Sequence, residues 1–471
     1  MLFNSLEYVL FLPLVVFLYY LTPGKYRWML LLAASYYFYM CWKVEYIILI
    51  LASTAIDYYA GIRMSRISRK RKRRPYLILS LVVNLGLLFS FKYFNFFTDS
   101  LNLAFEQFNI MAELPELKVM LPVGISFYTF QTLSYTIEVY KGNQQADHHL
   151  GYFALYVSYF PQLVAGPIER YDRLAPQLRK TTKLRYKNIS RGLRLVLYGL
   201  FIKMVIADNL AIYVDQIYAT PEKYMSGDLL TGIFFYSFQI YADFHGYSTI
   251  AIGTALMMGV NLMNNFKTPY LSANVMEFWK RWHISLSTWF RDYVYIPLGG
   301  SRVKTKSRWW FNIMAVFLIS GLWHGANWTF VFWGGIFGVV YLIEYLIRKL
   351  FRPSEVKKFS AGHLIRILVN FLIVTFAWIF FRSQSIDDAF GMIKRLGGQS
   401  PDQAESLDIK LYVWIFLGFF ILSDVLLYNK RFDKMLDKYH IIMRWIIYAI
   451  LIWAVIVYAG IAKNPFIYFQ F

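Results

Sequence analysis

The chain has 471 residues, of which 58% are hydrophobic, 20% aromatic and only 16% charged, whereas soluble proteins are roughly half apolar and a quarter charged. Its formal net charge of +21 does not indicate a nucleic-acid-binding protein, because the basic residues lie in short loops and no soluble basic module is present. These loops are instead expected to set the membrane orientation and to contact anionic lipid head groups.

The apolar residues form long runs, which is typical of an all-α protein that crosses a membrane many times. Since a helical span needs about 20 residues, about ten to twelve membrane helices fit in the chain. No tract is long enough for an additional soluble domain, so we expect residues 1–471 to form one domain. The apolar runs lie near 6–22, 27–43, 44–60, 76–98, 119–140, 150–166, 192–214, 228–260, 309–347, 364–381, 411–428 and 441–462.

The loops between these runs predict their orientation. Arg63–Arg74 holds eight basic residues and no acidic ones, so it should face the cytoplasm. The runs 119–140 and 150–166 are interrupted by prolines and glycines such as Pro122 and Pro161. We expect re-entrant or interfacial segments there, because such backbone is tolerated at membrane depth only where protein buries it.

The run 228–260 contains a polar island at Tyr241–Ser248. Asp243 is the carboxylate that the sequence places most deeply in an apolar run. It could orient a histidine, bind a cation, or pair with a basic residue. Structural pairing and a functional role are both open at this point.

The segment 278–292 is too charged to span a membrane. Its Trp279, Trp282, His283, Leu286 and Phe290 recur every three or four residues, which predicts an amphipathic helix that lies at the interface or folds inward. His283 would then share a face with the tryptophans and point into protein. A simpler alternative is an interfacial anchor, since aromatic and basic residues are common in that role.

The run 309–347 is flanked by basic loops, so both of its ends should lie on the cytoplasmic side with an even number of crossings between them. His324 is about 22 Å along a helix from Trp309, which is well into a hydrocarbon layer about 30 Å thick. Gly321 and Gly325 would let the chain bend and let a ligand approach the backbone. An ionisable group at such depth indicates function, although a neutral, hydrogen-bonded core histidine is an equal alternative.

The remaining histidines lie in polar or basic loops and are expected to be exposed. The single cysteine, Cys41, excludes a disulfide and a multi-cysteine metal site. The chain lacks HExxH, P-loop and GxSxG motifs, which argues against metalloproteases, nucleotide hydrolases and serine hydrolases. We therefore expect no metal site. The loop histidines are His148, His149, His363 and His440.

Taken together, four motifs resemble the membrane-bound O-acyltransferase (MBOAT) family, and specifically its bacterial alginate O-acetyltransferase branch. The resemblance extends over essentially the whole chain, so one MBOAT-type domain is expected over 1–471. Four motifs in the right order are specific, whereas one alone would be weak. They are FPQLVAGPIERYDRLAPQL at 160–178, YADFHGYSTIAIG at 241–253, FWKRWHISLSTWFRDYVYIPLGGSR at 278–302 and GLWHGANWTFVFWG at 321–334.

The resemblance implies acyl transfer from a thioester to a hydroxyl, with an essential membrane-buried histidine that corresponds to His324 and acts as general base. A second polar position corresponds to His283. The second motif departs from the DFSGYSD of this branch, since His245 and Thr249 replace its first serine and last aspartate, and roles carried by those positions are in doubt. Candidate substrate-binding or supporting residues are Asp243, Trp282, Arg291, Trp323 and Asn327.

The resemblance also implies the partners of the reaction. Acetyl-CoA or another acyl thioester would be the cytoplasmic donor, and no cofactor would be bound permanently. The acceptor would be an exported or cell-surface polysaccharide, reached directly or through an extracytoplasmic partner acyltransferase. The protein would be a multi-pass protein of the bacterial cytoplasmic (inner) membrane, in contact with lipid.

Two alternatives stay open at this stage. A D-alanyl transferase of teichoic acids is a sibling that takes its acyl group from a carrier-protein thioester. A proton-coupled transporter or flippase belongs to a different class, in which His324 and Asp243 would form a proton relay. That class predicts paired helix breaks in two halves of the chain, and the breaks seen here are unpaired.

Overall fold

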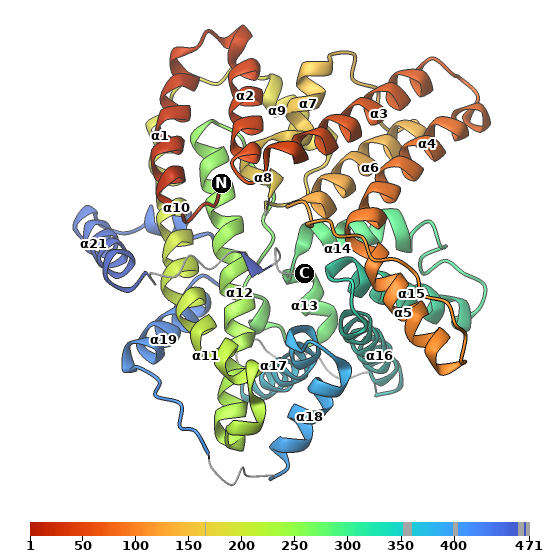
Figure 1. Cartoon of the computed structure of the whole chain (residues 1–471). Helices are drawn as coiled ribbons and strands as arrows, with labels where there is room; N and C mark the ends of the chain where they lie inside the picture. Colours follow the sequence, from red (N-terminus) through yellow and green to blue (C-terminus); the bar gives the residue numbers. More distant parts are fainter. Residues whose placement is uncertain (165, 352–359, 399–403, 460–465, 468–471) are drawn as a thin grey trace. The chain divides into compact units, whose positions relative to one another are not determined.

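The computed structural model describes residues 1–164, 166–351, 360–398, 404–459 and 466–467. Every regular element in these residues is helical, which confirms the predicted all-α class. The helices divide into two compact units, drawn in Figure 1. Unit 1 consists of Met1–Leu193 and Ala251–Met263, and unit 2 consists of Arg194–Ile250 and Asn264–Phe471.

Unit 1 is built mainly from the N-terminal helices. Within it, α3, α4 and α6 pack against one another, and α7 packs on α2, α3 and α9. The bounds are α1 (Leu6–Leu21), α2 (Arg27–Met40), α3 (Ile47–Ser65), α4 (Lys70–Leu88), α5 (Phe94–Gln107), α6 (Ile125–Lys141), α7 (Leu150–Ser158), α8 (Phe160–Leu163) and α9 (Tyr171–Arg179).

A buried polar network joins α3, α4 and α6. The carboxylate of Asp57 on α3 is completely buried. It accepts hydrogen bonds from Ser80 and Asn84 of α4 and from Thr136 of α6, the last at 3.0 Å. Because a buried carboxylate is costly unless it is hydrogen-bonded, these donors fix the three helices relative to one another.

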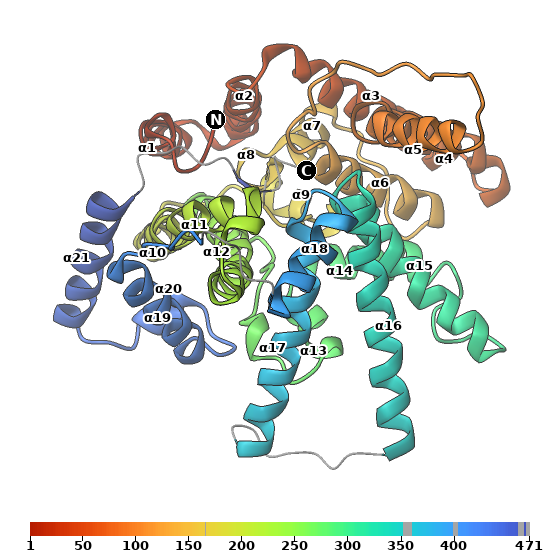
Figure 2. The same cartoon turned by 60° about the horizontal axis from the view of Figure 1, so that its bottom comes forward.

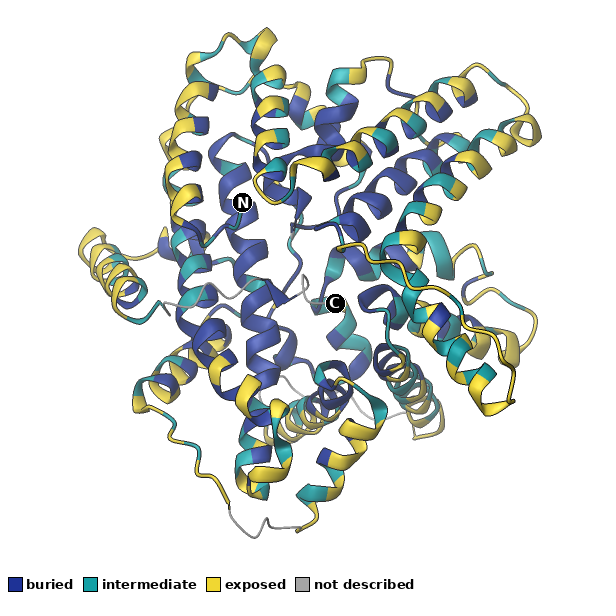
Figure 3. Ribbon diagram, viewed as in Figure 1, coloured by how far each residue is buried: buried dark blue, intermediate teal, exposed yellow. Residues whose placement is uncertain are grey.

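Unit 2 contains the C-terminal helices. The long helices α10 (Tyr186–Leu200) and α12 (Ser226–Met257) run through both units, and Figure 3 shows α12 buried along most of its length. The other bounds are α11 (Asp208–Ala219), α13 (Val275–Arg281), α14 (Ile284–Phe290), α15 (Lys306–His324), α16 (Trp328–Phe351), α17 (Ala361–Arg382), α18 (Ile386–Leu396), α19 (Leu411–Leu426), α20 (Phe432–Leu436) and α21 (Ile441–Tyr458).

Several helices are suited to a membrane, which confirms a multi-pass membrane protein. Two shorter apolar helices, α1 and α19, add to those that meet the length of a span. In the run 119–140 the chain enters the continuous helix α6 after Pro122 and Gly124, and the run 150–166 is divided into α7 and α8. That these segments are re-entrant or interfacial stays a prediction. The helices long and apolar enough to cross a membrane number six among the described residues: Val44–Ser65, Lys70–Gln107, Tyr186–Ala219, Trp328–Phe351, Ala361–Arg382 and Ile441–Tyr458.

The predicted hairpin over 309–347 is present as α15 and α16, which pack side by side and are joined by three residues (Figure 2). Glycines allow the close approach. A Cβ atom on Gly321 would lie 2.2 Å from the carbonyl oxygen of Phe330, and one on Gly334 would lie 2.3 Å from that of Phe317. Gly321 therefore serves helix packing, in addition to the bend that follows at Gly325.

Candidate active site

His324 is the last residue of α15, and its side chain is buried. The chain leaves the helix at Gly325, whose extended backbone (φ −154°) turns it towards α16. A Cβ atom on Gly325 would lie 2.0 Å from the ring of Phe330. The residue after the histidine must therefore be glycine, because any larger side chain would push Phe330 out of the hairpin.

His283 lies beside His324, with 6.3 Å between the two ring centroids. His283 is completely buried, and His324 is 2% exposed. The two histidines are 41 positions apart in the sequence of unit 2: His324 ends α15, and His283 immediately precedes α14. The structure thus brings together the two residues that the sequence singled out as catalytic.

The predicted continuous helix over 278–292 is wrong, because the chain breaks at His283. α13 ends at Arg281 and α14 begins at Ile284. His283 has φ 42° and ψ 52°, a left-handed conformation that costs energy in a residue with a side chain. The apolar face was nevertheless predicted correctly, since Trp282, His283 and Leu286 are all buried.

Asn265 fixes the backbone that follows His283. Its carbonyl oxygen accepts the N–H of Ile284 at 3.0 Å, and its amide oxygen accepts the hydroxyl of Ser285 at 2.6 Å. Its amide N–H in turn donates to Ser248 of α12 at 3.1 Å. Left-handed backbone persists only where the surroundings hold it, and Asn265 supplies that restraint.

Aromatic rings surround both histidines. The His324 ring meets Trp323 at 5.0 Å, Trp333 at 5.1 Å and Phe381 at 5.5 Å between centroids. The His283 ring packs edge-to-face on Phe244 at 4.6 Å and lies 6.0 Å from Trp323. Such walls exclude bulk water, and charged transition states are stabilised more strongly where water is excluded.

Burial also determines the protonation of His283, which lies outside the membrane-spanning helices. It lowers the pKa of this side chain from 6.5 to about 3, because the charged imidazolium loses its hydration in an apolar site. The imidazole is consequently neutral at physiological pH. A neutral ring can accept a proton or donate one hydrogen bond through its single N–H.

The indole N–H groups beside the histidines differ in their partners. Trp378 donates to the hydroxyl of Tyr270 at 3.1 Å. The indole nitrogens of Trp282 and Trp333 are buried and have no acceptor among the described residues. A buried N–H without an acceptor costs about 1–3 kcal/mol, so such donors are available to a bound group.

Asp243 is paired, in agreement with one of the two alternatives that the sequence left open. Its carboxylate lies 2.5 Å from the ammonium group of Lys203 and accepts the backbone N–H of Ile467 at 2.7 Å. Lys203 also contacts Asp208 at 2.7 Å. The next residue, Phe244, packs its ring on that of His283.

Of the four other supporting residues that the sequence suggested, Arg291 and Asn327 make contacts unrelated to the histidines. The Arg291 side chain is 60% exposed and pairs with the adjacent Asp292 at 2.8 Å. The Asn327 side chain donates to the Gln384 carbonyl at 2.8 Å and accepts the N–H of Thr329 at 2.9 Å, so it holds the turn before α16. Trp323 and Trp282 are buried, as the sequence indicated.

The loop histidines His148, His149 and His440 are exposed, as predicted, and His363 is half-buried. Among the described residues, no group of three His, Cys, Asp or Glu side chains could hold a metal ion. His245 and Thr249, the departures from the family motif, face each other with 3.4 Å between Nδ1 and the hydroxyl. Their contact is local to one turn of α12.

Some residues of the site were not predicted. Trp333 lies within the fourth motif, where several nearby aromatic residues show the same local pattern. The sequence therefore does not distinguish Trp333 from them. Phe381 lies on α17, and Lys203 lies on a π-helical turn at Phe201–Ala207. Both are outside the four motifs. A lysine inside an apolar run was the available signal for Lys203, because it needs a buried carboxylate.

Comparisons with known proteins identify the family of this chain. The family model of the membrane-bound O-acyltransferases matches residues 36–386. The chain is 41% identical to the "Probable alginate O-acetylase" of Azotobacter vinelandii over 83% of this chain and 77% of that protein. It is 36% identical to the protein of the same name in Pseudomonas putida, with both chains covered completely.

Two further relatives carry other names. The "Peptidoglycan O-acetyltransferase" of Helicobacter pylori is 35% identical over 78% of this chain and 73% of that protein. The "Teichoic acid D-alanyltransferase" of Bacillus subtilis is 34% identical over 45% of this chain and 56% of that protein. Both histidines of the site lie inside the matched family region. The chain therefore belongs to the membrane-bound O-acyltransferase family and is an O-acyltransferase.

Proposed function

We propose that this protein moves acetyl groups from a cytoplasmic thioester, acetyl-CoA, toward hydroxyl groups of an exported or cell-surface polysaccharide. Two relatives that it resembles over most of their length are named for acetylation of alginate or peptidoglycan. The observation that carries the proposal is the pair of buried histidines, 6.3 Å apart, inside the region that the family model matches.

His324 acts as the general base in this proposal. A sugar hydroxyl is a weak nucleophile at neutral pH, so its proton must be removed as its oxygen attacks the thioester carbonyl carbon. A neutral imidazole takes that proton while the new carbon–oxygen bond forms. When the carbon–sulfur bond breaks, the imidazolium returns the proton to the leaving thiolate, which yields the free thiol and neutral histidine.

His283 serves as a second polar group beside the base. Its low pKa keeps it neutral throughout the physiological range, so it can orient a hydroxyl or the thioester by hydrogen bonding without adding charge. The aromatic walls limit hydrolysis of the donor by keeping water away from the thioester.

The protein acts in the inner membrane of a bacterium in this proposal. Donor and acceptor then lie on opposite sides of the bilayer, and a buried histidine reachable from both faces would join them. The acceptor hydroxyl belongs either to the polysaccharide itself or to an extracytoplasmic partner acyltransferase that relays the acetyl group.

The test uses membranes that contain the full-length protein and acetyl-CoA labelled in the acetyl group. We expect labelled polysaccharide with the wild type and none with His324→Ala or His283→Ala at equal amounts of folded protein. His148→Ala is the matched control, because that histidine is exposed and lies in unit 1. Full activity of a folded His324→Ala variant would overturn the role of the base.

A second candidate function is transfer of D-alanine, which the similarity to the Bacillus subtilis relative favours. The same membranes should therefore receive D-alanyl carrier-protein thioester in a parallel reaction. Transfer from this donor, without transfer from acetyl-CoA, would replace the proposed substrate and leave the histidine chemistry unchanged.

A further inference from the structure

Trp333 is a buried tryptophan of unit 2 whose indole N–H has no acceptor among the described residues and whose ring contacts that of His324. It is 1% exposed and lies on the first turns of α16. Its ring contacts Trp378, Phe381 and His324 at centroid distances of 5.6, 5.0 and 5.1 Å. Apolar rings surround the indole, yet its N–H has no acceptor among the described residues.

Trp378 provides an internal comparison. The two indoles are stacked with 20° between their planes, and both are essentially fully buried. The N–H of Trp378 donates to Tyr270 at 3.1 Å. Two stacked indoles in the same aromatic surroundings therefore differ, because one N–H has an acceptor and the other has none. A buried N–H without an acceptor costs about 1–3 kcal/mol.

The position of Trp333 relative to His324 indicates what its N–H binds. The two rings meet edge-to-face at an interplanar angle of 90°, with 5.1 Å between their centroids, so the indole packs directly against the imidazole of the candidate base. Two other side chains that follow His324 in the sequence can donate a hydrogen bond, but the Asn327 amide donates to the Gln384 carbonyl and the Trp328 side chain is 54% exposed.

We propose that the indole N–H of Trp333 is the hydrogen-bond donor to the carbonyl oxygen of the acyl thioester. This inference rests on the proposed function and adds the residue that stabilises the negative charge on that oxygen. As the hydroxyl attacks, the carbonyl π electrons move onto oxygen, and the hydrogen bond that the indole N–H donates to this oxygen strengthens. When the carbon–sulfur bond breaks, the carbonyl re-forms and the electron pair leaves with sulfur.

The experiment replaces Trp333 and Trp378 separately, in the full-length protein, with phenylalanine and with benzothienylalanine. The latter keeps the bicyclic shape and replaces N–H with sulfur, so it remains informative if Trp333→Phe does not fold. Turnover is measured with saturating acetyl-CoA. The carbonyl stretching band of bound acetyl-CoA, labelled with carbon-13 at the carbonyl, is recorded by difference infrared spectroscopy.

Loss of the Trp333 N–H should lower kcat by about 10²–10³-fold, as for other single donors to a developing oxyanion, with KM changed less than tenfold. The carbonyl band should shift to the frequency of a carbonyl without a hydrogen bond. The Trp378 variants should keep kcat within about threefold of the wild type and should lose thermal stability instead, because that N–H binds Tyr270.

Equal kcat values for the Trp333 and Trp378 variants, or an unshifted carbonyl band in the Trp333 variants, would overturn the inference while the wild type still transfers acetyl groups. A wild-type protein that transfers none, with His324→Ala equally inactive, would overturn the proposed function and this inference with it. The two failures are thus distinguished by the wild-type activity.

Discussion

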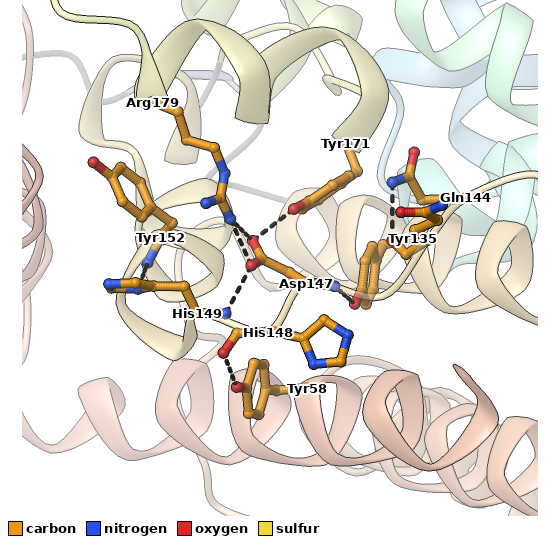
Figure 4. Close-up of polar contacts among 10 residues, drawn as sticks. Tyr58, Tyr135, Gln144, Asp147, His148, His149, Tyr152, Tyr171 and Arg179 are labelled. Carbon is orange, nitrogen blue, oxygen red and sulfur yellow. Dashed lines mark hydrogen bonds and ion pairs between the residues drawn. The ribbon is translucent and has the colours of Figure 1, made fainter. Parts of the chain in front are cut away.

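The surroundings of the histidine pair in unit 2 differ from those of the Asp147 cluster in unit 1. The carboxylate of Asp147 accepts bonds from Arg179 and Tyr171, both at 2.5 Å, and from the N–H of His149 at 2.9 Å (Figure 4). The histidines beside it are exposed. In unit 2 the histidines are buried, and their neighbours are aromatic rings.

Burial distinguishes the two sets of histidines. The partners of Asp147 donate hydrogen bonds to its carboxylate, and these bonds connect α9 to the loop before α7. The Nδ1 atom of His149 accepts the N–H of Tyr152 and so caps α7. The rings of His283 and His324 instead pack among aromatic side chains, which keep bulk water away from them.

The largest expected effect is on chemistry. His324→Gln, which keeps a polar side chain but cannot act as a base, should lower kcat by about 10²–10⁴-fold. Acetyl transfer should be measured on equal amounts of folded protein, because burial makes folding a separate variable. Asp147→Asn is the matched change in the other region, and a comparable loss of kcat there would erase the distinction between the two regions.

The next effect is on stability within unit 2. Lys203→Ala would leave two buried carboxylates without their cation, so we expect the free energy of unfolding to fall by about 3–5 kcal/mol. Denaturant titration in mixed micelles measures it. Lys223→Ala is the control, since that lysine pairs with Glu405 at the surface, and it should unfold like the wild type.

Acidic pH should lower the stability of the protein through His283. The folded pKa of His283 is about 3, below the ordinary 6.5, so below pH 6.5 the unfolded chain binds a proton that the folded chain does not. Stability should therefore fall by about 1.4 kcal/mol per pH unit as the pH drops from 6.5 towards 3. His283→Gln should flatten the pH dependence of unfolding by that slope, and an unchanged slope would contradict the neutral buried histidine.

The smallest effect concerns the Asp147 cluster itself. Asp147→Asn removes the charge but keeps the shape, and it weakens hydrogen bonds to a charged acceptor, which are worth about 1.5–3 kcal/mol. We expect lower thermal stability and an unchanged kcat for acetyl transfer. Asp215→Asn provides the control, because that carboxylate is mostly exposed where it binds Arg382. A change in kcat would place the cluster in the reaction.

Local patterns predicted part of this structure well. The hairpin over 309–347 followed from one long apolar run with basic ends, and the burial of His283 and Trp282 followed from a three-or-four spacing. The break at His283 was missed because its spacing is equally compatible with one helix. Only Asn265, 18 positions earlier in the chain, shows why the backbone turns there.

Long-range partners account for the rest. The ion pair of Asp243 with Lys203 joins residues 40 positions apart, and the sequence left pairing and function equally open. Trp333 could not be separated from its aromatic neighbours, because hydrogen-bond partners depend on where α17 packs. The packing of the assembled core determines which buried donors lack acceptors, and the spacing of residues in the sequence does not predict it.

The hydrogen bond from Ile467 to Asp243 has a consequence for biosynthesis. Helix α12, which carries Asp243, leaves the ribosome more than 200 residues before Ile467 does. During that interval Phe244 and Tyr247 lack the ring of Phe466 that later packs on them. Chains that stop before Phe466 therefore lack this aromatic packing on α12.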